Sequence, residues 1–228
     1  MPTIQEFLQK AAKDLQPRKI ICAGEKDLGH LEAEILLAHV LKKDRTFLHS
    51  DPSYVLRPAS SVLFTQLVAR RKKHEPVAYI IGSKEFYGYP FCVDKRVLVP
   101  RPDSELLVGL ALQTKPDLVW DVGTGSGAIA ISIAKKILRA KVVATDISTV
   151  ALTVARKNAK HLKARNITFL KVNLLDSSMR RFLSRSHSNY KLIILANLPY
   201  LPNADKPQLD PDVVKYEPPS ALFGGSSG

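Results

Sequence analysis

Between residues 118 and 196, short apolar segments alternate with longer segments of helical periodicity. The expected strands cover residues 118–122, 142–146, 167–172 and 191–196, and the expected helices cover 127–138, 148–162 and 177–184. A strand followed by a helix and a further strand is typical of the βαβ unit, whose strands run parallel. This part of the chain therefore predicts an α/β fold with a doubly wound, Rossmann-like parallel sheet.

The first 75 residues show a purely helical pattern instead. Thr3 and Glu6 have the spacing of a capping box at the start of a helix over 3–15. Further helices are expected from Asp27 to about residue 41, near residues 44–50, and from Pro58 to Lys73. The four consecutive cations that end at Lys73 lie where the negative end of the helix dipole would stabilise them. The alternative is that they contact RNA. We expect residues 1–75 to form a small helical domain.

Residues 76–101 separate the two patterns. Two β-prone segments, Val77–Ile81 and Phe86–Val99, are interrupted by glycine and proline residues that favour turns. This part of the chain is therefore predicted to be a β-hairpin connector. Residues 102–228 then form the α/β domain, which begins with a helix running to Leu112.

The composition excludes several classes of protein. The chain has 228 residues, 45% of them hydrophobic, which is ordinary for a folded globular protein and argues against disorder. No apolar run is long enough to span a membrane, and the N-terminal residues do not resemble a secretory signal. The two cysteines are far apart, and the six histidines lack metal-ligand spacing. We therefore expect a cytoplasmic protein with reduced thiols, no membrane segment and no metal site.

The formal charge of +13 is concentrated in one segment. Between residues 135 and 191 the chain carries 14 Lys and Arg against two Asp and Glu. A basic surface of this kind favours nucleic acid or the ribosome as a neighbour, and the alternative is a set of solvated helical faces. Charge alone does not decide between these two interpretations.

A glycine-rich turn, Asp121-Val-Gly123-Thr124-Gly125-Ser126-Gly127, follows the expected strand 118–122. Glycines at alternate positions let the backbone turn sharply and approach a ligand, and the next helix offers free N–H groups at its start. The spacing matches neither the dinucleotide fingerprint nor the phosphate-binding P-loop. Asp121 can order the loop or reach a cationic methionine moiety. The turn therefore points to S-adenosylmethionine, and a purely structural turn is the alternative.

Asp146 closes the next expected strand. A carboxylate at this position in a doubly wound fold accepts hydrogen bonds from the two hydroxyls of an adenosine ribose. The alternative is that Asp146 caps the helix 148–162. Asn173, after the third strand, fits a weaker contact with the edge of an adenine ring, or an ordinary loop position.

The segment Asn197-Leu198-Pro199-Tyr200 follows the fourth expected strand, at the end of the sheet where open α/β folds bind ligands. A planar NH₂ group is a poor nucleophile because its lone pair is delocalised, so it must be positioned well. The Asn197 side chain and the Leu198 carbonyl can accept its two hydrogens. Tyr200 can cover its flat face, and Pro199 restricts the preceding residue to an extended conformation. We predict that these residues hold an amide or amine for methyl transfer, and the alternative is a simple turn.

Six segments of the chain together resemble the peptide chain release factor N5-glutamine methyltransferase family. They are Glu75-Pro-Val-Ala-Tyr-Ile-Ile-Gly82, Glu85-Phe-Tyr-Gly88, Val97-Leu-Val-Pro-Arg-Pro-Asp-Ser-Glu105, Asp121–Gly127, Asn197–Tyr200 and Tyr216-Glu-Pro-Pro-Ser-Ala-Leu-Phe-Gly-Gly225. The segments that end at Glu105 and Gly225 are far more specific to the family than the glycine-rich turn. The similarity extends from about residue 3 to the last residue.

This resemblance implies a class I methyltransferase sheet, S-adenosylmethionine as the donor and a peptide chain release factor as the partner. The methyl group would go to the side-chain amide nitrogen of the glutamine in the Gly-Gly-Gln motif of that factor. By the same resemblance, residues 123–127 and Asp146 would bind the donor, and Leu174 would lie near its adenine. Asn197 would contact donor and substrate, residues 197–200 would hold the glutamine amide, and the N-terminal helices would grip the release factor.

Two features depart from the family. Position 198 is Leu where the family usually has Pro, and Asn-Leu-Pro-Tyr is also typical of rRNA adenine dimethyltransferases. An N6-adenine methyltransferase acting on RNA or DNA is therefore one alternative, which the basic segment supports. The family also normally continues past residue 228 with further strands, so we expect an incomplete sheet with an uncovered edge. A non-catalytic, truncated binding module is the second alternative.

Overall fold

The computed structural model describes residues 2–15, 28–173 and 191–228. The chain divides into two compact units, Met1–Ile81 and Gly82–Gly228. The division lies a few residues after the end of the helical domain that the sequence predicts. Within the described residues, no helix has the length and apolar character needed to cross a bilayer.

The first unit is helical, and it consists of α1 (Ile4–Leu15), α2 (Leu28–Leu41), α3 (Arg45–Ser50), α4 (Pro58–Lys72) and α5 (Val77–Ile81). The predicted capping box is present, because the Thr3 amide donates to Glu6 Oε2 at 2.9 Å and the Glu6 amide donates to Thr3 Oγ1 at 3.4 Å. Apolar residues of all five helices form one core, which includes Ile4, Leu36 and Phe64. The predicted cap Asp27 lies outside the described residues.

Two details of this unit differ from prediction. Val77–Ile81, expected as a strand, is a helical turn in which the amides of Tyr79 and Ile80 donate to the Pro76 carbonyl at 2.9 and 3.0 Å. Both side chains are buried, and Ile80 joins the core of the unit, so packing outweighs their strand preference.

Arg71, in the run of cations, is buried and donates to the Glu32 carboxylate at 2.6 and 2.8 Å instead of facing water.

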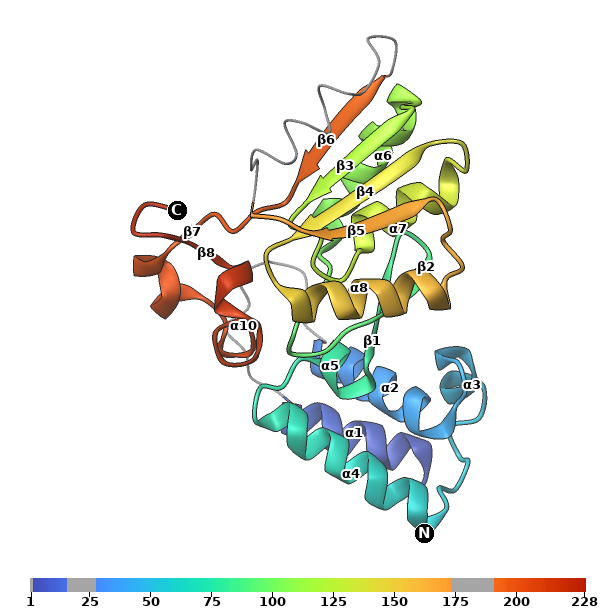
Figure 1. Cartoon of the computed structure of the whole chain (residues 1–228). Coiled ribbons are helices and arrows are strands. Elements are labelled where there is room, and N and C mark those ends of the chain that lie inside the picture. The colour runs from blue at the N-terminus through green and yellow to red at the C-terminus, as the bar shows by residue number, and fades with distance from the viewer. Residues whose placement is uncertain (1, 16–27, 174–190) are drawn as a thin grey trace. The chain divides into compact units, whose positions relative to one another are not determined.

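The second unit contains a four-stranded sheet, as predicted. Its strands are β3 (Leu118–Val122), β4 (Lys141–Asp146), β5 (Ile167–Lys171) and β6 (Leu192–Ala196). Their order is β5-β4-β3-β6, and all neighbours run parallel (Figure 1). The helix expected at 177–184 lies outside the described residues. Among those described, β6 forms one edge of the sheet, and its Ile194 is 47% exposed.

Three helices pack side by side beside this sheet: α6 (Glu105–Thr114), α7 (Ala128–Lys136) and α8 (Thr149–His161). Alternate residues of β3 belong to different apolar clusters. Val119 packs with residues of α6 and α7, whereas Trp120 and Val122 belong to the second cluster. This alternation places the strands between two apolar layers and leaves their carboxyl ends free to form a site.

A hairpin and a C-terminal segment complete the unit. The hairpin strands β1 (Ser83–Phe86) and β2 (Tyr89–Cys92) are antiparallel. The predicted β-segment to Val99 is therefore too long, because the chain turns where the Val97 amide donates to the Asp94 carbonyl at 3.0 Å. The remaining elements are η1 (Pro102–Ser104), β7 (Leu201–Pro202), η2 (Asn203–Gln208), α10 (Pro211–Tyr216), η3 (Pro219–Ala221) and β8 (Phe223–Gly225). Strands β7 and β8 pair in parallel.

Candidate active site

A cavity of about 510 Å³ lies at the carboxyl ends of β3, β4 and β6. This volume is in the range of small-molecule sites. The predicted site residues among those that line it are Gly123, Thr124, Gly125, Ser126, Asp146, Asn173, Asn197, Leu198 and Pro199. Gly127 and Tyr200 are not part of the lining of this cavity, and Leu174 lies outside the described residues. Residues from four separate parts of the sequence thus meet in one cavity.

Two positions of the glycine-rich turn, Gly123 and Gly127, favour glycine both for their backbone conformation and for lack of space. Gly123 and Gly127 have φ of +73° and +82°, a region that residues with a Cβ rarely adopt. A Cβ on Gly127 would also lie 2.7 Å from Ile131 Cδ1, and one on Gly123 would lie 2.9 Å from Leu198 Cδ2. The turn therefore packs closely against both α7 and the segment after β6.

Asp121 lies beneath this turn and is 1% exposed. Its Oδ2 accepts a hydrogen bond from Thr124 Oγ1 at 2.6 Å, and its Oδ1 has no hydrogen-bond partner among the described residues. Burial raises the pKa of Asp121 to about 6, the Thr124 hydroxyl opposes that rise, and the nearby Asp146 carboxylate adds to it. Since Asp121 does not line the cavity, its position favours the loop-ordering role among the two that the sequence suggested.

Asp146 joins the turn to the next helix. Its Oδ2 accepts from the Gly125 amide at 2.9 Å, and its Oδ1 accepts from the Ser148 amide at 2.8 Å. The N-cap of α8 is Ser148, whose hydroxyl accepts from the Ala151 amide, so Asp146 is not the cap. Each carboxylate oxygen can accept another hydrogen bond, so this side chain fits the two hydroxyls of a ribose.

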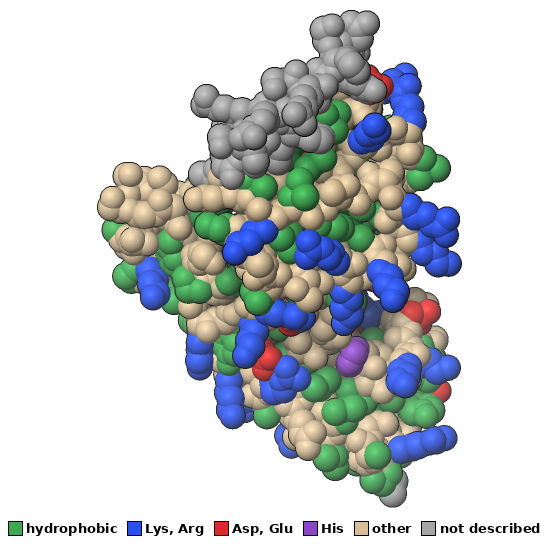
Figure 2. Space-filling view, in the orientation of Figure 1, with side chains coloured by type: hydrophobic (Ala, Val, Ile, Leu, Met, Phe, Trp, Pro, Cys, Tyr) green, Lys and Arg blue, Asp and Glu red, His purple; other side chains and the backbone are tan. Residues whose placement is uncertain are grey.

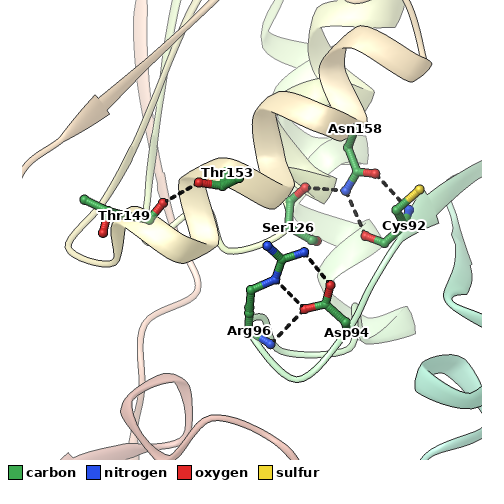
Figure 3. Close-up of polar contacts among 7 residues, drawn as sticks. All are labelled: Cys92, Asp94, Arg96, Ser126, Thr149, Thr153 and Asn158. Carbon is green, nitrogen blue, oxygen red and sulfur yellow. Dashed lines mark hydrogen bonds and ion pairs between the residues drawn. The ribbon is translucent and has the colours of Figure 1, made fainter.

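Asn158 is a structural residue of this site that the sequence reasoning missed. From α8 it points at the end of the hairpin and at the turn (Figure 3). It is fully buried, its Oδ1 accepts from the Cys92 amide at 2.8 Å, and its Nδ2 donates to the carbonyls of Cys92 and Ser126 at 3.0 and 2.9 Å. An asparagine on the apolar face of the predicted helix was the available signal, because such a residue needs polar partners.

The segment after the hairpin forms another wall of the cavity. Lys95, Arg96, Val97 and Leu98 line it. Arg96 binds the Asp94 carboxylate through Nε and Nη2 at 2.8 and 2.6 Å, which holds the pKa of Asp94 below its usual range (Figure 3). This contact folds the segment into a tight turn beside the Ser126 end of the glycine-rich loop.

On the opposite side of the cavity, Asn197 Nδ2 donates to Ser104 Oγ at 3.0 Å. Asn197 Oδ1 accepts no hydrogen bond from any other described residue. Leu198 packs against the apolar cluster that contains Trp120 and Val122. Tyr200, predicted to cover the substrate, is 72% exposed.

The two most family-specific segments meet at this cavity. Arg101 Nη2 donates to Glu217 Oε1 at 2.8 Å, although the two residues are 116 positions apart. Glu217 is 4% exposed, and burial raises its pKa while Arg101 opposes that rise. The residues that follow, Pro218, Ser220 and Ala221, line the cavity. Recognising these segments from the sequence did not reveal that they bind each other.

Outside the cavity, basic side chains gather over α8 and β5 (Figure 2). The described cations of these elements and of the loop between them are Arg156, Lys157, Lys160, Lys163, Arg165 and Lys171. We call them the basic face. In the described part of the chain, no ion pair joins any of them to an acidic side chain.

The described residues also contain no group of three or more His, Cys, Asp and Glu that could hold a metal ion.

Two family models match the chain. The PrmC N-terminal domain matches residues 6–82, and a methyltransferase domain matches residues 114–211. The first match covers the helical unit and the second covers most of the parallel sheet.

Relatives are known from several bacteria, and this chain covers about two thirds to three quarters of their length. A release factor glutamine methyltransferase of Geobacter sulfurreducens is 40% identical over 88% of this chain and 68% of its own length. Those of Nitratidesulfovibrio vulgaris and Bordetella pertussis are 35% and 39% identical, over 99% and 88% of this chain and 74% and 73% of theirs. At these identities, over most of both sequences, the similarity extends to both units.

Proposed function

The chain belongs to the release factor glutamine methyltransferase family, and on this premise we propose that it transfers a methyl group from S-adenosylmethionine to the side-chain amide nitrogen of a glutamine in a peptide chain release factor. By the resemblance of its sequence segments, that glutamine is the one in the Gly-Gly-Gln motif. The observation that carries this proposal is the cavity shared by the glycine-rich turn, Asp146 and the segment Asn197–Pro199.

In this proposal, one side of the cavity binds the donor. Gly123–Gly127 and Asp146 take the nucleoside and methionine parts, with Asn173 and Leu174 near the adenine. The hydrogen-bonded contacts of Asp146 with Gly125 and Ser148 hold its carboxylate in place before the donor arrives. Such preorganisation reduces the ordering that binding would otherwise require.

The other side holds the acceptor amide. Asn197 Oδ1 and the Leu198 carbonyl accept its two hydrogens, Pro199 stiffens the turn, and the exposed ring of Tyr200 lies next to them in sequence, ready to cover a bound glutamine. The amide nitrogen attacks the methyl carbon as the carbon–sulfur bond breaks and its electron pair stays on sulfur. The nitrogen then loses one proton to water. This chemistry depends on orientation and needs no strong base.

We further propose that the helical unit, residues 1–75 in the sequence-based division, recognises the release factor. The match of residues 6–82 to a domain specific to this family supports this role. Because release factors act on ribosomes, we place the reaction in the cytoplasm. The basic face would then bring the enzyme near ribosomal RNA through sequence-independent contacts with phosphates.

Incubation of the chain with labelled donor and either a release factor or RNA tests the proposal. We expect label in the release factor, and the replacement Asn197→Ala to abolish transfer with only a modest loss of donor binding. Label in RNA alone would favour the N6-adenine alternative. A folded sample with no affinity for the donor in calorimetry would favour the non-catalytic binding module.

RNA proximity needs a separate measurement. We expect weak binding to an RNA duplex that falls steeply with salt, and a smaller salt slope when Lys157, Lys160 and Lys163 are changed to Gln. Changing Lys10, Lys13 and Lys42 of the helical unit instead is the matched control. An unchanged slope in the first variant would contradict a role for the basic face.

A further inference from the structure

The proposed role of Asn197 requires one of two orientations of its side-chain amide. With Oδ1 toward the cavity, the group accepts a hydrogen from the substrate NH₂. Rotated by half a turn, it would present its own N–H groups to the substrate nitrogen, and the contact would be repulsive. A neighbouring group that holds the side chain in the productive orientation would therefore favour transfer.

Ser104 is placed to hold the side chain in this orientation. Asn197 Nδ2 donates to Ser104 Oγ at 3.0 Å, while Asn197 Oδ1 has no partner among the described residues. Both residues line the cavity. A hydroxyl can donate as well as accept, so its contribution is to hold the side chain in place. In the observed orientation it accepts from Nδ2 and leaves the amide oxygen for the substrate.

The hydroxyl of Ser104 is not used for the role that its position suggests. Ser104 is the N-cap of α6, where serine normally accepts a hydrogen bond from the first turn of the helix. Here the side chain makes no capping hydrogen bond. The preceding 3₁₀ turn, in which the Ser104 amide donates to the Arg101 carbonyl at 3.1 Å, leads the chain into the helix instead.

The backbone around Ser104 is held on both sides. Arg101 donates to the buried Glu217 at 2.8 Å, and Glu105 Oε1 accepts from the Tyr87 amide at 2.8 Å. Three residues of one short segment therefore contact three separate parts of the site. A side chain on such a fixed segment can hold another one within the tolerance that methyl transfer requires.

We propose that Ser104 is a positioning residue, whose hydroxyl fixes the Asn197 amide with Oδ1 toward the acceptor nitrogen. This inference rests on the function proposed above. Ser104 acts through Asn197 and takes no part in bond making. Its removal should therefore affect the rate of transfer more than the binding of either substrate.

The test compares Ser104→Ala with Ser104→Thr, which keeps the hydroxyl, and with Asp103→Ala as an exposed neighbouring control. For Ser104→Ala we expect kcat to fall about tenfold or more, with the KM for the release factor and the Kd for the donor changed less than about twofold. Ser104→Thr and Asp103→Ala should retain a kcat near that of the original chain. Unchanged kcat in Ser104→Ala, or equal losses in the Ala and Thr variants, would overturn the proposal.

A spectroscopic measurement separates this inference from the proposed function. The side-chain NH₂ signals of Asn197 in a ¹⁵N spectrum are identified by their loss in Asn197→Ala. We expect them to move in Ser104→Ala and to stay near their original positions in Ser104→Thr. If the chain methylates no release factor, the proposed function fails, while unmoved signals in Ser104→Ala overturn the positioning role alone.

Discussion

At the scale of single residues, the buried carboxyl of Asp121 links the site to pH. Its folded-state pKa of about 6 lies above the ordinary value of 3.8, because burial disfavours the charged form. Between about pH 4 and pH 6, Asp121 is therefore mostly protonated in the folded chain and mostly ionised in the unfolded chain. The stabilisation from this proton is fully present below about pH 4 and is lost as the pH rises through about 6.

The replacement Asp121→Asn tests this linkage, because an amide oxygen can still accept from Thr124 but does not titrate. Between about pH 4 and pH 7, the free energy of unfolding of the original chain should fall by about 2–2.5 kcal/mol relative to that of the variant. Urea unfolding at several pH values measures this difference. Parallel curves for the two proteins would contradict the raised pKa.

Gly127 provides a second test at this scale. Gly127→Ala adds both backbone strain and a contact at 2.7 Å with Ile131 Cδ1. Gly88→Ala is a matched control, because Gly88 has φ of +76° but open space around its Cα. We expect Gly88→Ala to lower the free energy of unfolding by about 1–2 kcal/mol through backbone strain. Gly127→Ala should lower it by about 1–3 kcal/mol more, because its Cβ is also crowded.

Only the Gly127 variant should also bind the donor less tightly, as measured by calorimetry, because the adjoining turn must shift. Equal losses of stability in the two variants would show that the close packing against α7 has little energetic weight.

At the scale of elements, Asn158 joins α8 to the hairpin and to the glycine-rich turn. Asn158→Ala would leave the Cys92 amide and two carbonyls without their partner. We therefore expect a loss of at least about 2 kcal/mol in the free energy of unfolding, together with weaker donor binding.

Asn166→Ala is the control for this change. Asn166 also donates to two carbonyls, those of Ile137 and Ala140, at 3.1 and 2.8 Å, but it does not line the cavity. The Asn166→Ala variant should therefore have a lower free energy of unfolding but an unchanged affinity for the donor. A similar effect of both variants on donor affinity would contradict a specific role for Asn158.

The sequence predicts the elements of the parallel sheet well, because alternation of strands and helices is a local signal. The β3–β6 strands lie within one or two residues of their expected positions. The prediction of a strand over Val77–Ile81 was wrong. Its β-branched residues favour a strand locally, whereas their burial in the core of the helical unit favours a helix. The pairings of Arg71 with Glu32 and Arg101 with Glu217 could not be predicted, because they join residues far apart in the chain.

At the scale of the whole molecule, each unit has an apolar core of its own. The core of the first unit contains residues 4–81, and the cores of the second contain residues 86–198. Every residue that lines the cavity belongs to the second unit. We therefore expect donor binding to depend on the second unit, and release factor recognition is proposed for the first.

A protein consisting of Gly82–Gly228 tests this separation. We expect it to bind S-adenosylmethionine with a Kd within about threefold of that of the whole chain, because it contains all the described residues that line the cavity. It should lose most of its affinity for a release factor, measured by the same calorimetry. Circular dichroism confirms that the fragment is folded, and a folded fragment with full affinity for the release factor would contradict the proposed role of the helical unit.

The contact of Leu198 with Gly123 also limits how a sequence of this kind can change over time. The leucine methyl group occupies the space that a side chain at position 123 would need. A larger residue at position 123 would have to displace this methyl group and would also have to adopt a φ of +73°, which residues with a Cβ rarely do. Glycine at position 123 is therefore favoured both by its own backbone conformation and by a side chain that lies 75 positions away in the chain.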